Sequence, residues 1–132
     1  MKGSYLLLIE LKEGKKIRIG KIGNIYFPKG YYLYVGSAMN GIEKRIARHI
    51  KKDKKMRWHI DYLLKNANLI EIFYKENEIR EECRIAENFL LSGFSFIKKF
   101  GASDCRCKSH LFHTKNKEDF YRMAEKIEMR RM

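Results

Sequence analysis

The sequence predicts a single α+β domain over residues 1–132, because strand patterns come first and helical patterns dominate later. Three strand-like runs precede the first helical pattern, and three more helical patterns follow it, with short strand patterns between them. A chain of 132 residues can form one core but not two comfortable ones. Since 45% of its residues are hydrophobic, the domain is expected to fold without disulfides.

The three expected strands differ in pattern. Residues 5–11 are almost continuously apolar, which is typical of a strand buried on both faces. Residues 17–19 alternate after a charged, glycine-containing turn, so these two runs are expected to form a hairpin. Residues 20–26 are less regular, and the third strand, residues 31–35, is aromatic and β-branched.

The first helix is expected from residue 41 to residue 52, since Asn40 and Glu43 have the spacing of a capping box. Arg45 and His49 are four residues apart and therefore share one face of this helix. Further helices are expected at 56–64, at 79–91 before Gly93, and from Asn116 toward Arg131, with strands at 69–75 and 111–113.

The chain is strongly basic. Its 29 Lys and Arg residues against 16 Asp and Glu residues give a formal net charge of +13, which favours a polyanionic partner. No apolar run approaches the length of a membrane-spanning helix and no signal-peptide layout is found, so nucleic acid is expected rather than a membrane. A Lys- and Glu-rich composition is also typical of thermophiles, and both explanations can hold. Three cysteines at irregular spacing fit a reducing cytoplasm.

The end of the third strand carries the most suggestive chemistry. Tyr34 leads into Gly36, and the helix that follows presents Arg45 and His49. A guanidinium is a permanent, forked cation suited to phosphate oxygens, and a phenol can orient a water molecule or a phosphate oxygen. Tyrosine is a poor base unless a cation stabilises its phenolate, because its ordinary pKa is about 10. The set therefore indicates a phosphate-handling site.

Several blocks together carry a family resemblance. Gly3-Ser4-Tyr5 begins the first strand, Tyr34-Val35-Gly36 ends the third, and Arg45 and His49 follow on the helix. In this order the chain resembles the GIY-YIG nuclease superfamily. It is most similar to a little-characterised archaeal and bacterial branch, some of whose members are fused to a base-excision DNA glycosylase. The later blocks that match this branch are Trp58-His59-Ile60-Asp61-Tyr62-Leu63-Leu64, Glu82-Cys83 and Ser103-Asp104-Cys105-Arg106-Cys107-Lys108-Ser109-His110-Leu111.

The resemblance implies a mostly antiparallel, three-stranded central sheet flanked by helices, here with a C-terminal helix added. It also implies a DNA endonuclease that uses one divalent metal ion. In such enzymes Tyr5, Tyr34 and Arg45 would position the scissile phosphate and the attacking water, and His49 would complete the site. One glutamate with waters and phosphate oxygens suits Mg²⁺ or Mn²⁺.

The metal-binding glutamate is expected at Glu82, with Glu87 as the alternative. Glu82 matches the Glu-Cys block of the branch, whereas Glu87 better fits the superfamily's spacing to the end of the helix. The two point about 140° apart on a helix, so only one can face the site. Members of the superfamily usually carry a proline and an asparagine in the segment after this helix. This chain departs from that pattern, because its only proline is Pro28.

Other residues are candidates for contacts with nucleic acid. Arg48 is expected at backbone phosphates or in solvent, together with Lys44 and Lys51. Trp58, His59 and Asp61 could form a platform for stacking and hydrogen bonding, but the favoured interpretation is that Trp58 anchors its short helix to the core.

A last candidate group is formed by Cys105, Cys107 and His110, with Cys83 or Asp104 as a further partner. Zinc is possible here but ranks behind Mg²⁺ or Mn²⁺, because Cys-x-Cys-x-x-His is not a common zinc-finger spacing. The alternatives are that this segment forms a structural turn or that it contributes residues to the active site.

The main hypothesis is thus a cytoplasmic, metal-dependent DNA endonuclease connected with DNA repair, whose partner could be a repair glycosylase. The first rival is a catalytically silent nucleic-acid-binding module that targets a repair partner. The second is a zinc-stabilised interaction domain built around Cys105 and Cys107.

Overall fold

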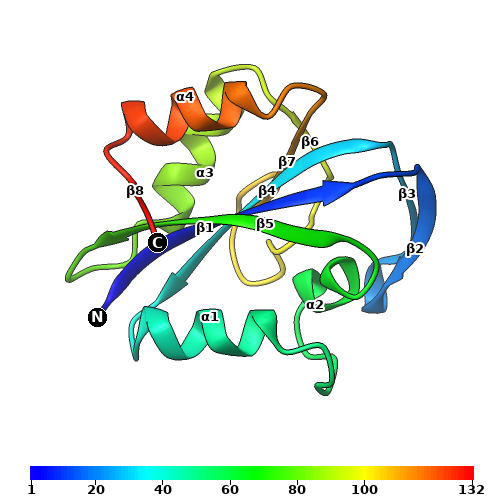
Figure 1. The fold of residues 1–132 in the computed structure, drawn as a ribbon, viewed down its shortest axis with the longest axis horizontal. Helices are drawn as coiled ribbons and strands as arrows, with labels where there is room; N and C mark the ends of the chain where they lie inside the picture. The colour runs from blue at the N-terminus through cyan, green and yellow to red at the C-terminus, as the bar shows by residue number, and fades with distance from the viewer.

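The computed structural model describes residues 1–132 and is organised around one antiparallel sheet (Figure 1). The strands of this sheet are β1 (Gly3–Leu11), β4 (Gly30–Ala38), β5 (Asn68–Glu76), β6 (Ser95–Phe96), β7 (Leu111–Thr114) and β8 (Arg130–Arg131). Their order is β6-β7-β4-β1-β5-β8, and every neighbouring pair is antiparallel. The α+β class and the antiparallel sheet are confirmed. The expected count of three strands is wrong, since six strands pair, two of them too short to show any periodicity.

Strand β1 is the centre of the sheet. It pairs with β4 along one edge and with β5 along the other, and nearly all of its residues are buried, as the apolar run predicts. The expected hairpin between residues 5–11 and 17–19 is wrong, because both edges of β1 are occupied. Instead, β2 (Lys15–Ile19) pairs with β3 (Gly23–Phe27) in a separate two-stranded sheet.

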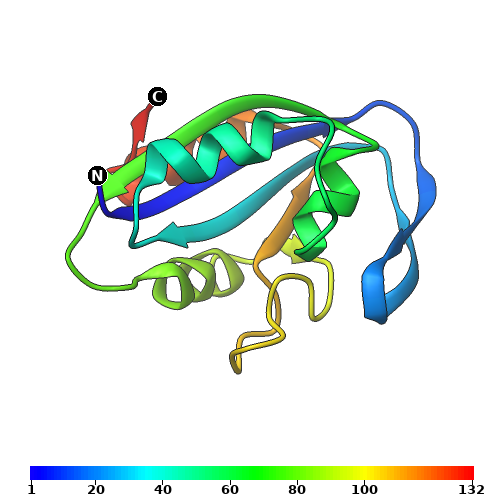
Figure 2. The same cartoon turned by 90° about the horizontal axis from the view of Figure 1, so that it is seen from below.

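Helices cover both faces of the sheet (Figures 1 and 2). One face carries α1 and α2, and the opposite face carries α3 and α4. Alternate residues of β1 supply the two cores: Leu7 and Ile9 pack with Ile42 of α1, whereas Leu6 and Leu8 pack with the other layer. The helix bounds are α1 (Ile42–Ile50), α2 (His59–Leu64), α3 (Glu82–Leu91) and α4 (Glu118–Lys126).

The helix ends correct several expectations. No side chain caps α1, whose N-cap is Gly41, and the Glu43 carboxylate lies 3.3 Å from the amino group of Met1 instead of completing a capping box with Asn40. Helix α3 ends as predicted, because Gly93 adopts a positive φ of 89° just beyond it. Helix α4 stops before residue 131, since Arg130 and Arg131 pair with β5.

Candidate active site and metal-ligand cluster

Tyr5 and His49 meet between β1 and α1. The Tyr5 hydroxyl and His49 Nε2 share a hydrogen bond of 2.7 Å, and the two residues are only 1% and 3% exposed. Gly36 lies opposite Tyr5 in the β1–β4 register. A Cβ atom at Gly36 would overlap the Tyr5 ring, which gives a physical reason for the glycine after Tyr34 and Val35.

Tyr34 and Arg45 complete this cluster, which we call the tyrosine site (Tyr5, Tyr34, Arg45 and His49). The half-buried Tyr34 ring lies 6.5 Å from the Tyr5 ring and 6.3 Å from the His49 ring, centroid to centroid. Arg45 Nη1 donates a 3.1 Å hydrogen bond to the Ser37 carbonyl at the end of β4. The four residues that the sequence predicts for one site therefore lie together.

Burial sets the protonation states in the tyrosine site. It raises the pKa of Tyr5 to about 12, although the neighbouring Arg45 partly offsets this effect. Burial also raises the pKa of Tyr34 well above 10. His49 is affected in the opposite direction: burial first, and then the charge of Lys54, lower its pKa to about 3. At neutral pH both phenols are therefore protonated and His49 is an uncharged imidazole.

Of the two candidate glutamates, Glu82 is the one that acts on the tyrosine site. Its charge is among the causes that raise the pKa values of Tyr5 and Tyr34, after burial, whereas Glu87 has no such effect. Glu82 lies in the first turn of α3 with its side chain 26% exposed. Its ion pair with Arg80 at 3.7 Å is weak, because the Arg80 side chain is 66% exposed. The Glu82 carboxylate is therefore free to accept another partner.

Asp61, expected only as part of a platform for nucleic acid, has a structural role that sequence reasoning missed. Its fully buried carboxylate accepts hydrogen bonds from both terminal nitrogens of Arg48, at 2.9 and 3.0 Å, and from the backbone N–H groups of Arg57 and Trp58. Burial alone would raise the pKa of Asp61, but these donors outweigh it and the pKa is lowered. The sequence feature that could have revealed this role is the position of Asp61 three residues after the N-cap of α2, where a capping box has its acidic residue.

The buried Asp61 carboxylate determines which contacts Arg48 and Trp58 make. Arg48 is held by Asp61, whereas Lys44 and Lys51 are exposed and form no ion pair. The guanidinium groups of Arg45, Arg48 and Arg57 lie 4.6, 4.3 and 5.3 Å from the Trp58 ring centroid. Trp58 also packs against the buried core, so it anchors α2.

His59 connects α2 to the segment between Ile97 and His110, which we call the 97–110 loop. The Gly101 N–H donates a 2.8 Å hydrogen bond to His59 Nδ1, and His59 Nε2 lies 3.5 Å from Ser103 Oγ. Gly101 itself has a φ of +68°, and its backbone lies against the Tyr34 ring and the His110 side chain. His59 therefore positions a wall of the tyrosine site.

Cys83, Cys105, Cys107 and His110 form a second cluster, which we call the cysteine–histidine cluster. Their ligand atoms all lie within 4.8 Å of one another, so the group could hold a metal ion. Asp104, the alternative fourth partner, is not among them. Burial raises the pKa values of the Cys83 and Cys107 thiols and lowers that of His110. Sulfur and nitrogen donors favour zinc over Mg²⁺ at this cluster, although the spacing alone made a zinc site the less expected interpretation.

These features define an α+β domain with a buried tyrosine–histidine pair and an adjacent cysteine–histidine cluster. The chain belongs to the family described as "Domain of unknown function DUF123", whose model matches residues 4–131. No curated protein and no solved structure matches the chain. None of its helices has the length and apolar character needed to cross a membrane.

Proposed function

We propose that this protein is a divalent-metal-dependent DNA endonuclease that hydrolyses a phosphodiester bond. The observation that carries the proposal is the convergence of Tyr5, Tyr34, Arg45 and His49 from three elements, with the charge of Glu82 acting on both phenols. A guanidinium, two hydroxyls and a carboxylate provide for phosphate binding and for one cation.

The burial of each residue suggests its role. Tyr5 is 1% exposed, so it acts as a positioning residue that holds His49 through their 2.7 Å hydrogen bond. Tyr34 and Arg45 are only half-buried and can reach a bound phosphate. Because His49 is neutral, it adds no charge beside Arg45, and its hydrogen bond fixes the direction of the Tyr5 hydroxyl.

The carboxylate of Glu82 fits a hard divalent cation, since it is partly exposed and held only by a weak surface pair. Mg²⁺ and Mn²⁺ often bind through one carboxylate, with waters and substrate phosphates as the other ligands. Such an ion would supply charge neutralisation at the phosphate and a more acidic bound water. The cysteine–histidine cluster, whose donors are sulfur and nitrogen, would be a separate zinc site.

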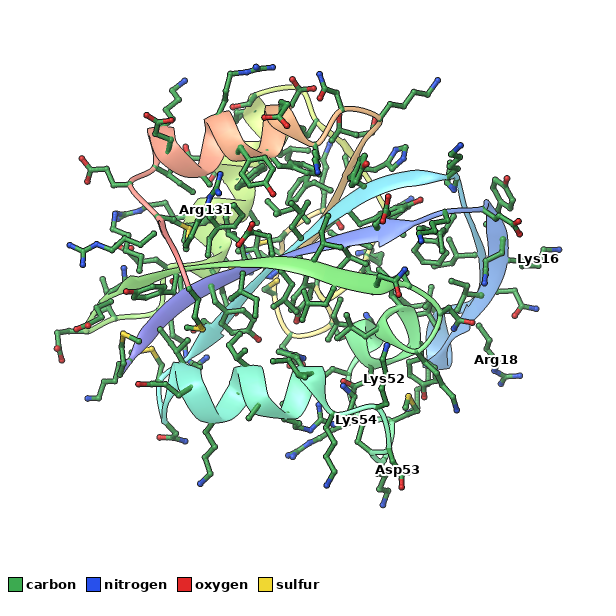
Figure 3. The ribbon with its side chains drawn as sticks, viewed as in Figure 1. Lys16, Arg18, Lys52, Asp53, Lys54 and Arg131 are labelled. Carbon is green, nitrogen blue, oxygen red and sulfur yellow. The ribbon has the colours of Figure 1, made fainter.

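Basic side chains near α1 and α2 support binding to DNA. Lys52 and Lys54 lie in the segment after α1, and Arg18 extends from β2, against which α2 packs (Figure 3). Lys54 has a structural task there, because its Nζ donates to the carbonyls of Arg48 and His49 at the end of α1. Lys44, Lys51 and Arg18 are exposed, and we propose them as phosphate contacts.

The test is cleavage of supercoiled plasmid in Mg²⁺ or Mn²⁺. We expect the wild type to nick the plasmid, and Tyr34→Phe and Arg45→Ala to lose activity by about 100-fold or more. The matched control is Tyr31→Phe, a half-buried tyrosine on the same strand that packs against the opposite core. If wild type and variants all leave the plasmid intact, the endonuclease proposal fails.

The second candidate function is a catalytically silent nucleic-acid-binding module that brings a repair partner, such as a DNA glycosylase, to its target. One observation favours it: the pKa values of both tyrosines are raised, so neither phenol is a base at neutral pH without a cation. Retarded plasmid mobility without cleavage, equal in the wild type and in Tyr34→Phe, would support this module instead.

A further inference from the structure

We propose that Cys83, Cys105, Cys107 and His110 bind one Zn²⁺ ion, which clamps the first turn of α3 to the 97–110 loop beside the tyrosine site. Cys83 comes from α3, and the other three ligands come from the loop. The existence of the zinc site does not depend on the proposed endonuclease function. Its effect on Glu82, described below, rests on that function.

The spacing of the ligand atoms fits one tetrahedral ion. His110 Nε2 lies 3.5 Å from Cys105 Sγ and 3.8 Å from Cys83 Sγ. Zinc–sulfur and zinc–nitrogen bonds of about 2.3 and 2.0 Å place neighbouring tetrahedral ligands roughly 3.5–3.8 Å apart. Four ligand atoms within 4.8 Å of one another therefore leave room for a single ion after only small side-chain adjustments.

His110 is already oriented as a ligand. Its Nδ1 lies 3.3 Å from the Val35 carbonyl oxygen, which can only accept, so Nδ1 carries the hydrogen and the Nε2 lone pair faces the thiols. The backbone fixes the residue on both sides: Val35 N–H donates to the His110 carbonyl, and His110 N–H donates to the Phe100 carbonyl. A backbone carbonyl on the far nitrogen is the usual outer-shell partner of a zinc-bound histidine.

The charge balance is also favourable. Zn²⁺ replaces the protons of three thiols, so binding releases three protons and leaves three zinc–sulfur bonds, one zinc–nitrogen bond and a net charge of −1. A cavity beside the cluster is lined by Arg84, Arg106 and Lys108 as well as by Cys83 and Cys107. These cations stabilise the anionic complex.

The clamp would hold the part of the loop that is least supported by the fold. The base of the loop is closed by a 2.7 Å hydrogen bond from the Lys99 N–H to the Lys108 carbonyl, whereas Cys105 and Cys107 lie at its tip, outside any helix or strand. Gly101 of the same loop packs against Tyr34, and Cys83 directly follows Glu82. Zinc would therefore fix Glu82 relative to Tyr34.

The first experiment measures metal content. Elemental analysis of the purified chain should find one zinc per chain, and Co²⁺ substitution should produce a thiolate-to-cobalt charge-transfer band. Cys105→Ser and Cys107→Ser should weaken zinc binding by at least about 100-fold, whereas Asp104→Asn, which changes an exposed residue of the same loop outside the cluster, should not. Substoichiometric zinc in the wild type, or full zinc retention in both serine variants, would overturn the proposal.

The second experiment needs no variant. Trypsin sites in the loop, at Lys98, Lys99, Arg106 and Lys108, are exposed. Chelation should speed cleavage at these four sites, added Zn²⁺ should restore protection, and the exposed sites at Lys51 and Lys55 should change little. Equal cleavage with and without zinc would refute the clamp. Because neither experiment measures DNA cleavage, a failed endonuclease proposal would leave both results unaffected.

Discussion

Replacing Asp61 by Asn is expected to destabilise the fold by about 2–4 kcal/mol. Removing one partner of a buried ion pair typically costs about 3–5 kcal/mol, and losing an acceptor at a helix start costs about 1 kcal/mol. Two features of the site reduce the sum. Asn retains one side-chain oxygen, which can still accept some of the four hydrogen bonds that the Asp61 carboxylate accepts. The Arg48 side chain is 25% exposed, so water can partly replace the lost carboxylate oxygen as its partner.

Urea unfolding followed by circular dichroism and by the fluorescence of Trp58 measures this change, since Trp58 is the only tryptophan and packs against Arg48. For a domain of this size, 1 kcal/mol corresponds to roughly 3 °C, so Tm should fall by about 6–12 °C. The matched control is Asp53→Asn, because Asp53 is exposed in the preceding segment and forms no ion pair (Figure 3). Its effect should stay within about 0.5 kcal/mol. Equal unfolding midpoints for Asp61→Asn and Asp53→Asn would refute the reasoning.

Three more predictions concern the tyrosine site and the basic surface. Gly36→Ala should cost about 1–3 kcal/mol in urea unfolding, because the new methyl group overlaps the Tyr5 ring; a neutral substitution would contradict that packing. The pKa of His49 is lowered to about 3, so the folded chain keeps it neutral while the unfolded chain protonates it near pH 6.5. The stability that this group contributes is present above pH 6.5 and is lost as the pH falls toward 3; an NMR titration with a His49 midpoint near 6.5 would disprove this. Binding of duplex DNA, measured by fluorescence anisotropy, should weaken by at least about tenfold between 50 and 200 mM salt, and flat binding would exclude a phosphate-directed interface.

Local patterns in the sequence were sufficient to predict the elements that build the tyrosine site. The apolar run in β1 and the aromatic run in β4 reflect strands that are buried on one or both faces. The four-residue spacing of Arg45 and His49 placed both on one face of α1, and the structure brings His49 on that face to Tyr5 of β1. No contact between distant segments had to be known for these predictions.

Pairing between distant segments could not be predicted in the same way. The two-residue strands β6 and β8 exist only because β7 and β5 offer them an edge. Strand β2 pairs with β3 because β4 and β5 already occupy both edges of β1, and no local sequence pattern could indicate this. Likewise, the Cys-x-Cys-x-x-His spacing within the 97–110 loop looked unlike a zinc finger. Only the packing of α3 against this loop decides that Cys83, rather than Asp104, is the fourth member of the cluster.

The most direct test of the proposed function compares two glutamates on α3. Plasmid cleavage in Mg²⁺ should fall by about 100-fold or more in Glu82→Gln, because of these two glutamates it is Glu82 whose charge contributes to the raised pKa values of Tyr5 and Tyr34. It should be unchanged in Glu87→Gln, which makes the same chemical change at an exposed position of the same helix. Equal cleavage rates for the two variants, or loss of activity in Glu87→Gln alone, would contradict the assignment of the active site.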